Sequence, residues 1–247
     1  MQRVAIVPIL AALMFCLVGC RSSQPGSTAG PIDQTAEQSV PAATMTQPAE
    51  PALDDDPRPR IVCFGDSLTA GYGTDPGEAY PDFLQKMLDQ EGYSYRVVNA
   101  GVSGNTTKDG IERLDRVIAL KPALVVVEFG GNDGLRGLRV ADTRANLDKI
   151  VSRLTASGTR VVLAGITLPP DYGPDYIRQF NETYSLLAKK YHVPMLPFLL
   201  KGVFGVNGMM QADRTHATAA GNKIVAENVR ELIEPLLKKQ PATPEQQ

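Results

Sequence analysis

The sequence predicts an α/β protein, a three-layer α/β/α sandwich built on a five-stranded parallel sheet. Short runs rich in β-branched residues alternate with amphipathic segments over residues 60–238, which is typical of an open sheet covered by helices. Two of the runs, Leu124–Val127 and Val161–Ala164, are apolar throughout, as in strands buried on both faces. Right-handed crossovers then fix the hand of the fold.

The strands and helices are expected to alternate along the chain. We expect strands at Ile61–Phe64, Tyr95–Asn99, Ala123–Phe129, Arg160–Ile166 and Pro194–Pro197. We expect helices near Tyr80–Glu91, Thr107–Leu120, Asp142–Ser157, Asp175–Tyr191 and Ala219–Lys238. Ligands of open parallel sheets bind beyond the carboxyl ends of the strands, so residues that directly follow a strand are the candidates for function.

The amino terminus has the character of a targeting segment. Arg3 gives it a positive start, and the apolar run Val4–Val18 is shorter than the ~20 residues of a membrane span. Its end, Leu17–Cys20, resembles the lipobox of bacterial lipoproteins, which implies removal of residues 1–19 and lipid attachment at Cys20. An uncleaved anchor or a plain secretory signal are the alternatives. By analogy, Arg21 after the cysteine suggests sorting to the outer membrane.

Two further segments are expected to lie outside the folded domain. Residues 20–59 have no aromatic residue and many Pro, Ser, Thr, Gln and Ala, a composition that buries too little apolar surface to fold. We interpret them as a disordered tether that carries the lipidated cysteine. Residues 239–247 are interpreted as a disordered tail, which leaves residues 60–238 as the domain. The expected location is the cell envelope, on the periplasmic face of the outer membrane where the cell has two membranes.

Charge and cysteine content restrict the partners. Lys and Arg number 25 against 27 Asp and Glu, so no basic excess points to nucleic acid. Cys63, within the first expected strand, is the one cysteine of the domain, and we expect it to be a buried core residue. With two histidines and no paired ligand spacing, we expect neither a metal nor a cofactor. The membrane is an expected partner, through the lipid at Cys20, and a monomer is expected.

Polar segments follow three of the expected strands, and a fourth precedes the last helix. These segments are Gly65–Gly71, which contains Ser67, then Asn99–Asn105, Gly130–Asp133 and Asp213–His216. Since the carboxyl ends of parallel strands share one edge of a sheet, the first three segments are expected to meet there, and the fourth to fold over them. Together they offer a serine, an imidazole, a carboxylate and spare hydrogen-bond donors, as acyl transfer requires. The alternative for Ser67 is a capping role at a helix start.

The serine needs a base, and the chain offers two histidines. His192 lies at the expected end of a helix, where a cationic side chain suits the helix dipole. This leaves His216 as the predicted general base toward Ser67, with Asp213 holding its other ring nitrogen. Asp66 is a rival carboxylate, although shaping the turn at the serine is the role we expect for it.

The four segments together resemble the sequence blocks of the GDSL, or SGNH, hydrolases. The matching residues are Gly65–Leu68, Gly104, Gly131–Asp133, and Asp213 with His216. The segments Gly130–Gly137, Pro169–Gly173 and Val193–Phe198 are similar to the thioesterase I, arylesterase and lysophospholipase branch. The resemblance covers the whole domain and implies the flavodoxin-like fold of this family. It also implies a serine esterase that cleaves carboxylic esters, and thioesters, through an acyl-serine intermediate. The expected substrate is therefore a small-molecule or lipid ester.

The resemblance further implies an oxyanion hole made of the backbone N–H groups of Ser67 and Gly104 and the side-chain amide of Asn132. A turn residue is the alternative for Asn132. The family often has Gly-Ile-His-Pro around the histidine, whereas this chain has Arg214-Thr215-His216-Ala217. The departure bears on substrate preference more than on activity.

Two other functions use the same residues or the same fold. One is a carbohydrate O-acetylesterase of the cell envelope, for which an open polar cleft is expected. The other is a non-catalytic envelope lipoprotein. For the esterase, the segments that contain Leu135, Leu138, Leu168, Tyr172 and Tyr176 are expected to border an acyl groove.

Overall fold

The computed structural model of the chain describes residues 56–239. The predicted signal segment, Cys20, and all but a few residues of the predicted tether and tail lie outside the described residues. The described strands and helices begin at Arg60 and end at Leu236.

The described residues form one parallel sheet with helices on both faces. Its strands are β1 (Arg60–Gly65), β2 (Arg96–Gly101), β3 (Leu124–Glu128), β4 (Arg160–Ala164) and β5 (Met195–Leu196). The helices are α1 (Ser67–Ala70), α2 (Tyr80–Gln90), α3 (Thr107–Ala119), α4 (Gly131–Leu135), α5 (Val140–Ala156), α6 (Pro174–Tyr191) and α7 (Ala219–Ile233). Two 3₁₀ turns, Pro170–Tyr172 and Glu234–Leu236, complete the set.

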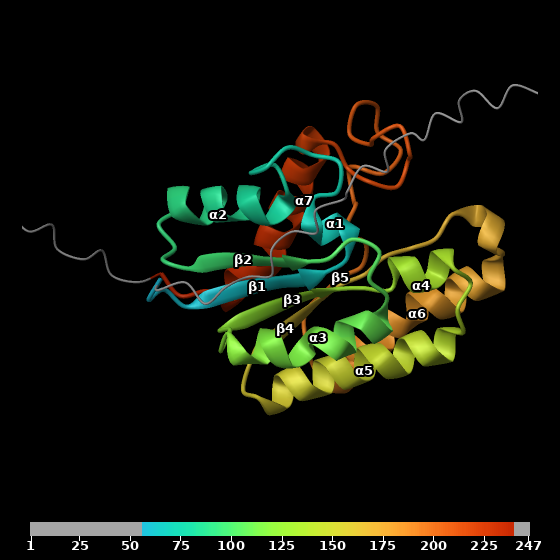
Figure 1. Ribbon diagram of the computed structural model, residues 1–247, viewed down its shortest axis with the longest axis horizontal. Helices are drawn as coiled ribbons and strands as arrows, with labels where there is room; N and C mark the ends of the chain where they lie inside the picture. The colour runs from blue at the N-terminus through green and yellow to red at the C-terminus, as the bar shows by residue number, and fades with distance from the viewer. Residues whose placement is uncertain (1–55, 240–247) are drawn as a thin grey trace, which may run out of the picture. The chain divides into compact units, whose positions relative to one another are not determined.

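The strand order is β2-β1-β3-β4-β5 and all neighbours are parallel. Figure 1 shows α2 and α7 on one face of the sheet and α3, α5 and α6 on the other. The short helices α1 and α4 lie at the edge where the strands end (Figure 1). The predicted fold class, a three-layer sandwich around a five-stranded parallel sheet, is therefore confirmed.

The core forms because the central strands carry apolar side chains on both faces. Every residue of β3 is buried, and Phe64 of β1 packs edge-on against Phe129 with ring centroids 4.8 Å apart. Helix α3 approaches this layer closely at Gly110, where a Cβ would lie 3.1 Å from Phe129 and 3.2 Å from Ile150 of α5. A larger residue at position 110 would therefore push the helix away from the sheet.

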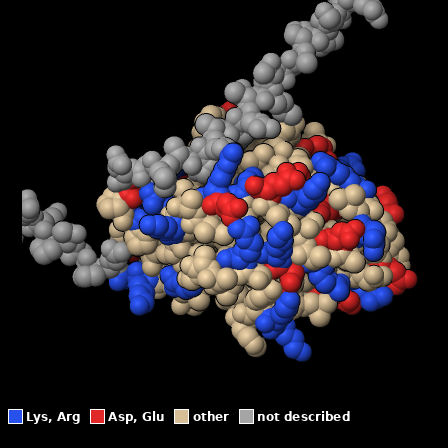
Figure 2. Space-filling model, turned by 60° about the horizontal axis from the view of Figure 1, so that its bottom comes forward, with Lys and Arg blue, Asp and Glu red and all other residues tan. Residues whose placement is uncertain are grey.

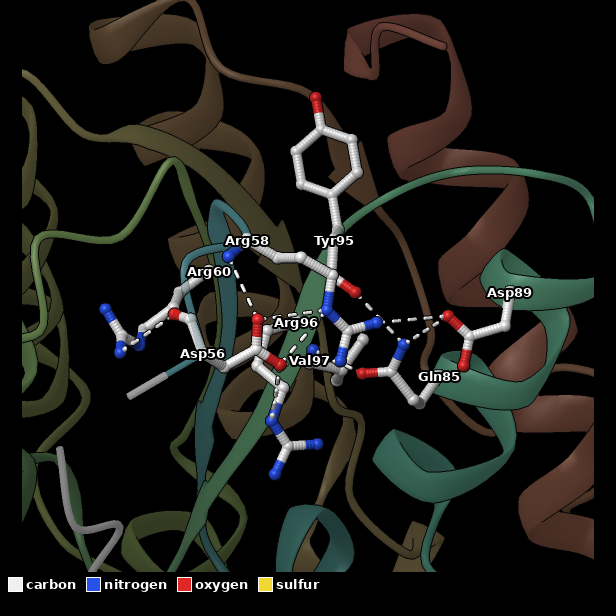
Figure 3. A network of polar contacts seen from close by, with 8 residues as sticks. All are labelled: Asp56, Arg58, Arg60, Gln85, Asp89, Tyr95, Arg96 and Val97. Carbon is white, nitrogen blue, oxygen red and sulfur yellow. Dashed lines mark hydrogen bonds and ion pairs between the residues drawn. The ribbon is translucent and has the colours of Figure 1, made fainter. Parts of the chain in front are cut away.

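The outer edge of the sheet is protected by a side chain of α2. Strand β2 is an edge strand, so one row of its backbone groups lacks a strand partner. Gln85 supplies one: its Oε1 accepts from the Val97 N–H at 2.7 Å, and its Nε2 donates to the Tyr95 carbonyl at 3.0 Å. Figure 3 shows this amide beside β2, together with Asp56, which accepts hydrogen bonds from the Arg58 side chain. The amino-terminal end of the sheet is thus tied to α2.

Ion pairs join the helices of one outer layer. Lys190 of α6 lies 2.6 Å from Asp148 of α5, and Arg153 of α5 pairs with Asp115 of α3. On the face shown in Figure 2, Lys and Arg side chains lie beside Asp and Glu side chains. Exposed pairs of this kind each contribute ~0–1 kcal/mol, so packing rather than charge holds the layer together.

The structure contains all the predicted strands and helices, with two kinds of difference. The short helices α1 and α4 were not predicted, since four and five residues rich in Gly, Ser and Asn give no periodic pattern. The last helix stops at Ile233 rather than continuing to Lys238, because Pro235 lacks the N–H that the next helical bond needs. No helix within residues 56–239 has the length and apolar character to cross a membrane.

Replacement of Ile150 by Ala should test the core. Ile150 is fully buried between α3 and α5, so the substitution leaves a cavity and should lower the free energy of unfolding by about 2–5 kcal/mol. Urea denaturation measures this change. Lys149→Ala, on the exposed face of the same helix, is the matched control and should change it by less than about 0.5 kcal/mol. Equal effects of the two variants would contradict the described orientation of α5.

Candidate active site

The site lies at the carboxyl edge of the sheet, where three neighbouring strands end. Ser67 begins α1 directly after β1, Gly104 lies in the turn after β2, and Asn132 lies in α4 after β3. The register places Gly65 beside both Gly101 and Glu128, so the three strands end at the same level. The sequence-predicted residues Ser67, Gly104 and Asn132 all line one cavity, and His216 lines it too.

A chain of hydrogen bonds joins Ser67, His216 and Asp213. The Nε2 atom of His216 lies 2.8 Å from the Ser67 Oγ, and its Nδ1 lies 2.6 Å from the Asp213 Oδ2. With Nδ1–H donating to the carboxylate, Nε2 is the acceptor toward the serine hydroxyl, which is the tautomer that a general base needs. The predicted serine, base and carboxylate are therefore brought together in the predicted order.

The loop Asp213–His216 is shaped by the carboxylate itself. Asp213 Oδ1 accepts the backbone N–H groups of Thr215 at 2.9 Å and His216 at 3.0 Å. The turn requires a positive φ of 58° at Arg214, an uncommon conformation for a residue other than Gly. Although desolvation opposes it, hydrogen bonding from His216 and Thr215 lowers the pKa of Asp213 to about 2. The carboxylate is therefore ionised at neutral pH and favours a positive charge on His216.

The ring of His216 also has an apolar neighbour. Tyr72, just after α1, lies with its ring centroid 4.6 Å from that of His216. The imidazole side chain is 16% exposed, whereas the Asp213 side chain is 40% exposed. The ring is thus held on its edge by Asp213 and on its face by Tyr72, with Nε2 directed to the serine.

The candidate oxyanion donors Gly104 and Asn132 line the same cavity as Ser67 and His216. Gly104 has a φ of 80°, which favours Gly at this position. The Asn132 amide donates from Nδ2 to Asp66 Oδ2 at 3.1 Å and to the Asn105 carbonyl at 3.0 Å. These two bonds fix the amide where it lines the cavity.

Asp66, the rival carboxylate, has a different place from Asp213. Its Oδ1 accepts the Leu68 N–H at 3.1 Å and so caps α1, and its Oδ2 accepts the Asn132 amide. It therefore shapes the serine turn, as expected, and also orients Asn132. Burial raises the pKa of Asp66 to about 6, against the favourable effects of the Leu68 N–H and of nearby His216.

A second carboxyl group, Glu128, lies beneath the site and was not predicted. It is fully buried at the end of β3, and its Oε2 accepts the Asp66 N–H at 3.2 Å and the Thr69 hydroxyl at 2.8 Å. Its Oε1 has no hydrogen-bond partner among residues 56–239. Burial and the charge of Asp66 raise the pKa of Glu128 well above its usual range, which favours the protonated form of this carboxyl group. In the sequence it resembles an ordinary polar residue at a strand end.

Arg113 of α3 is another residue that the sequence did not single out. Its guanidinium donates to the carbonyl groups of Gly65 and Ala100, both at 2.6 Å, and to the Asn105 Oδ1 at 2.7 Å. It also stacks over the ring of Phe64, 4.5 Å from the centroid. Arg113 thereby joins the ends of β1 and β2 and the turn that holds Gly104.

The cavity beside Ser67 has a volume of about 410 Å³ and mostly apolar walls. The apolar side chains that line it are Leu68, Leu135, Ile166, Leu168, Pro169, Phe198, Leu200 and Phe204. Of the segments expected to border an acyl groove, Leu135 and Leu168 contribute lining residues. Leu138, Tyr172 and Tyr176 are not among the lining residues. Phe198 and Phe204 come from the loop after β5, which has no periodic pattern in the sequence, and the aromatic residue Tyr72, just after α1, also lines the cavity.

The remaining candidates lie elsewhere. His192 ends α6 with a φ of 52°, at the position expected for it. Cys63 is buried in β1, and burial raises the pKa of its thiol to about 12, so it is a core residue. Within residues 56–239, no group of three or more His, Cys, Asp and Glu side chains could hold a metal ion.

A serine, an imidazole and a carboxylate in series at the edge of a parallel sheet, beside an apolar cavity, form the arrangement of an ester hydrolase. The chain belongs to the GDSL-like Lipase/Acylhydrolase family, which matches residues 63–224. The protein is a carboxylic ester hydrolase, as predicted.

Similar proteins agree with this assignment. The chain is 46% identical over 178 residues to Esterase TesA of Pseudomonas aeruginosa. The matched region covers 72% of this chain and 89% of the relative. It is 35% identical over 178 residues to the Thioesterase 1/protease 1/lysophospholipase L1 of Escherichia coli K12, with 72% and 84% covered. The crystal structure of TesA superposes with a TM-score of 0.70 and covers 72% of this chain and 99% of that one.

Replacement of Glu128 by Gln should change how stability depends on pH. Because the pKa of Glu128 is raised from 4.5, the folded protein keeps a proton that the unfolded chain releases. Its contribution is therefore full below about pH 4.5 and declines as pH rises toward the folded pKa. The variant lacks this decline, so its free energy of unfolding relative to the parent should increase by ~1 kcal/mol or more between roughly pH 5 and pH 8.

Urea titrations at several pH values measure this difference. Glu112→Gln, at an exposed position of α3, is the control and should show no such trend. A constant difference between parent and Glu128→Gln at all pH values would contradict a raised pKa of Glu128.

Proposed function

We propose that Ser67 is the nucleophile, His216 the general base and Asp213 the residue that orients His216. The observation that carries the proposal is the hydrogen-bonded series Ser67–His216–Asp213 at the wall of the apolar cavity. The Ser67 Oγ forms a bond to the acyl carbon as its proton passes to Nε2 of His216. His216 then gives this proton to the departing alcohol or thiol, and water hydrolyses the acyl-serine by the same steps.

The proposed oxyanion hole consists of the N–H groups of Ser67 and Gly104 and the amide of Asn132. Donors of this kind are each worth ~3 kcal/mol when they are held in place before the reaction. Asn132 is held by Asp66 and by the Asn105 carbonyl. Since an amide nitrogen has two hydrogens, an oxyanion shares one of them with these acceptors.

The proposed substrates are esters and thioesters of acyl chains. The apolar lining of the cavity supports them, because each CH₂ that it buries contributes ~0.8 kcal/mol. A carbohydrate O-acetylesterase would be expected to have an open polar cleft instead. The relative named thioesterase 1 and lysophospholipase L1 supports the same substrate classes.

The proposed location is the cell envelope, with the domain anchored by lipid at Cys20. The lipobox-like Leu17–Cys20 and the composition of residues 20–59 support it. Lysophospholipids and other envelope esters are then the natural substrates that we propose, because cytoplasmic acyl thioesters would not reach an anchored domain. We further propose that the protein acts as a monomer.

Replacement of Ser67 by Ala should abolish ester hydrolysis. Without the nucleophile, kcat for p-nitrophenyl acetate, butyrate and octanoate should fall by about 10⁴-fold or more. Release of p-nitrophenol measures the rate, and a fluorophosphonate probe should label the parent but not the variant. The control is Ser185→Ala, on the exposed face of α6, which should keep full activity and labelling. Residual hydrolysis by Ser67→Ala at the parent's rate would refute the nucleophile.

Replacement of Cys20 by Ala should prevent lipid attachment in the bacterial host. The full chain should incorporate labelled palmitate and sediment with membranes, and Cys20→Ala should lose both properties. Cys16→Ala, four residues earlier, is the matched control and should retain the label. Palmitate incorporation that persists in Cys20→Ala would rule out the proposed anchor.

A further inference from the structure

Four aromatic side chains form a column along one side of α6. Tyr172, Tyr176, Phe180 and Tyr184 follow one another at intervals of four residues, so they lie on one face of the turn and helix. Adjacent ring centroids lie 6.4, 6.4 and 5.7 Å apart. The first two pairs are stacked and Phe180 meets Tyr184 edge to face, so packing along the column restricts how far any one ring can move.

The three tyrosine hydroxyls of this column all donate to backbone carbonyl groups of one segment. Tyr184 bonds to the Phe129 carbonyl at 2.9 Å, Tyr172 to that of Leu135 at 2.8 Å, and Tyr176 to that of Leu138 at 2.6 Å. The segment between the first and last of these carbonyls, residues 129–138, contains Asn132. The column is therefore attached to both ends of the segment that carries the proposed oxyanion donor.

The backbone of the far end of this segment is bonded mainly within the segment, since the N–H groups of residues 136–138 donate to carbonyls of residues 132–134. Leu135 and Leu138 are 40% and 41% exposed, so burial of their side chains contributes little to holding the backbone. The carbonyl of Leu135 is at the end of α4, where a helix leaves its last carbonyls without partners within the helix. The Tyr172 and Tyr176 hydroxyls supply hydrogen bonds at these two positions. Partial burial and the charge of Asp133 raise the pKa of Tyr176, which keeps its hydroxyl a donor.

The position of this segment determines part of the cavity wall. Leu135 lines the cavity, and Gly134 lies so close to Leu168, another lining residue, that a Cβ would be 2.4 Å from it. On the other side, Arg136 donates to the Gly104 carbonyl at 2.9 Å. A shift of residues 135–138 would thus move Leu135 away from the acyl chain.

We infer that Tyr172 and Tyr176 are positioning residues that set the acyl-chain-length preference, by holding the Leu135 wall against the cavity through their hydroxyl groups. Neither side chain lines the cavity, so the effect reaches the substrate through Leu135. The inference rests on the proposed function, since it concerns the acyl chain of that reaction. Loss of these hydroxyl groups should therefore lower the selectivity for long acyl chains, by raising KM for the long-chain ester.

The experiment compares Tyr172→Phe, Tyr176→Phe and the double variant with the parent, on p-nitrophenyl acetate and octanoate. These substitutions keep the rings and the column and remove the hydroxyl groups alone. The ratio of kcat/KM for octanoate to that for acetate should fall about fivefold or more in the double variant, through a higher KM for octanoate. Each single variant should show a smaller change in the same direction.

Tyr191→Phe is the matched control. Tyr191 is on the same helix, but its hydroxyl bonds to Asp148 of α5, away from the cavity. The Tyr191→Phe variant should leave the ratio of kcat/KM for octanoate to that for acetate unchanged. An unchanged ratio in the folded double variant, or an equal loss for both esters, would overturn the inference. So would an equal change in Tyr191→Phe. A parent protein that hydrolyses neither ester would instead refute the proposed function.

Discussion

The register of the three neighbouring strands β2, β1 and β3 is the constraint on which the site depends. Gly65 of β1 lies level with Gly101 of β2 and Glu128 of β3, so the chain leaves all three strands at one height. A Cβ at Gly65 would lie 2.1 Å from the Thr69 hydroxyl, and a Cβ at Gly101 would lie 2.2 Å from the Ala70 nitrogen. The two glycines therefore let α1, which carries Ser67, settle directly on the sheet edge.

This close approach has an electrostatic cost beneath the serine. Bringing α1 down on the strand ends buries the carboxyl groups of Asp66 and Glu128 side by side. Hydrogen bonds offset this cost. The Asp66 N–H and the Thr69 hydroxyl donate to Glu128, and the Leu68 N–H and the Asn132 amide donate to Asp66. Hydrogen bonding of this kind is what makes a buried polar group tolerable. The same contacts hold the candidate oxyanion donor in place, so support and function share one network.

The two sides of the cavity have separate origins in the chain. The polar side comes from the ends of β1, β2 and β3, which the sheet holds, and from the loop Asp213–His216. The apolar side comes largely from the ends of β4 and β5 and the loops that follow, with Leu168, Phe198 and Phe204 among the lining residues. Loops tolerate sequence change better than strands, so substrate preference can vary on the apolar side while Ser67, Gly104 and Asn132 keep their places at the strand ends.

Much of the fold could be predicted, since apolar runs and amphipathic segments report strands and helices directly. Ser67, Gly104 and Asn132 could be placed together because parallel strands end at one edge. Glu128 and Arg113 could not be singled out: one resembles a solvated strand end and the other a charge on a helix surface, and only packing shows that they are buried or bridging. Phe198 and Phe204 lie in a stretch without periodicity, so nothing in the pattern relates them to the serine.

The hydrogen bond between Ser67 and His216 joins positions 149 residues apart, and this separation has a consequence for biosynthesis. A ribosome releases the serine turn long before the loop Asp213–His216, which precedes α7, the last helix of the domain. Contacts of such long sequence separation form late, after the loops between them have closed. The serine of a growing chain therefore has no imidazole beside it. Only the finished domain has the pair, so a chain that is still being synthesised cannot bring the serine and the imidazole together.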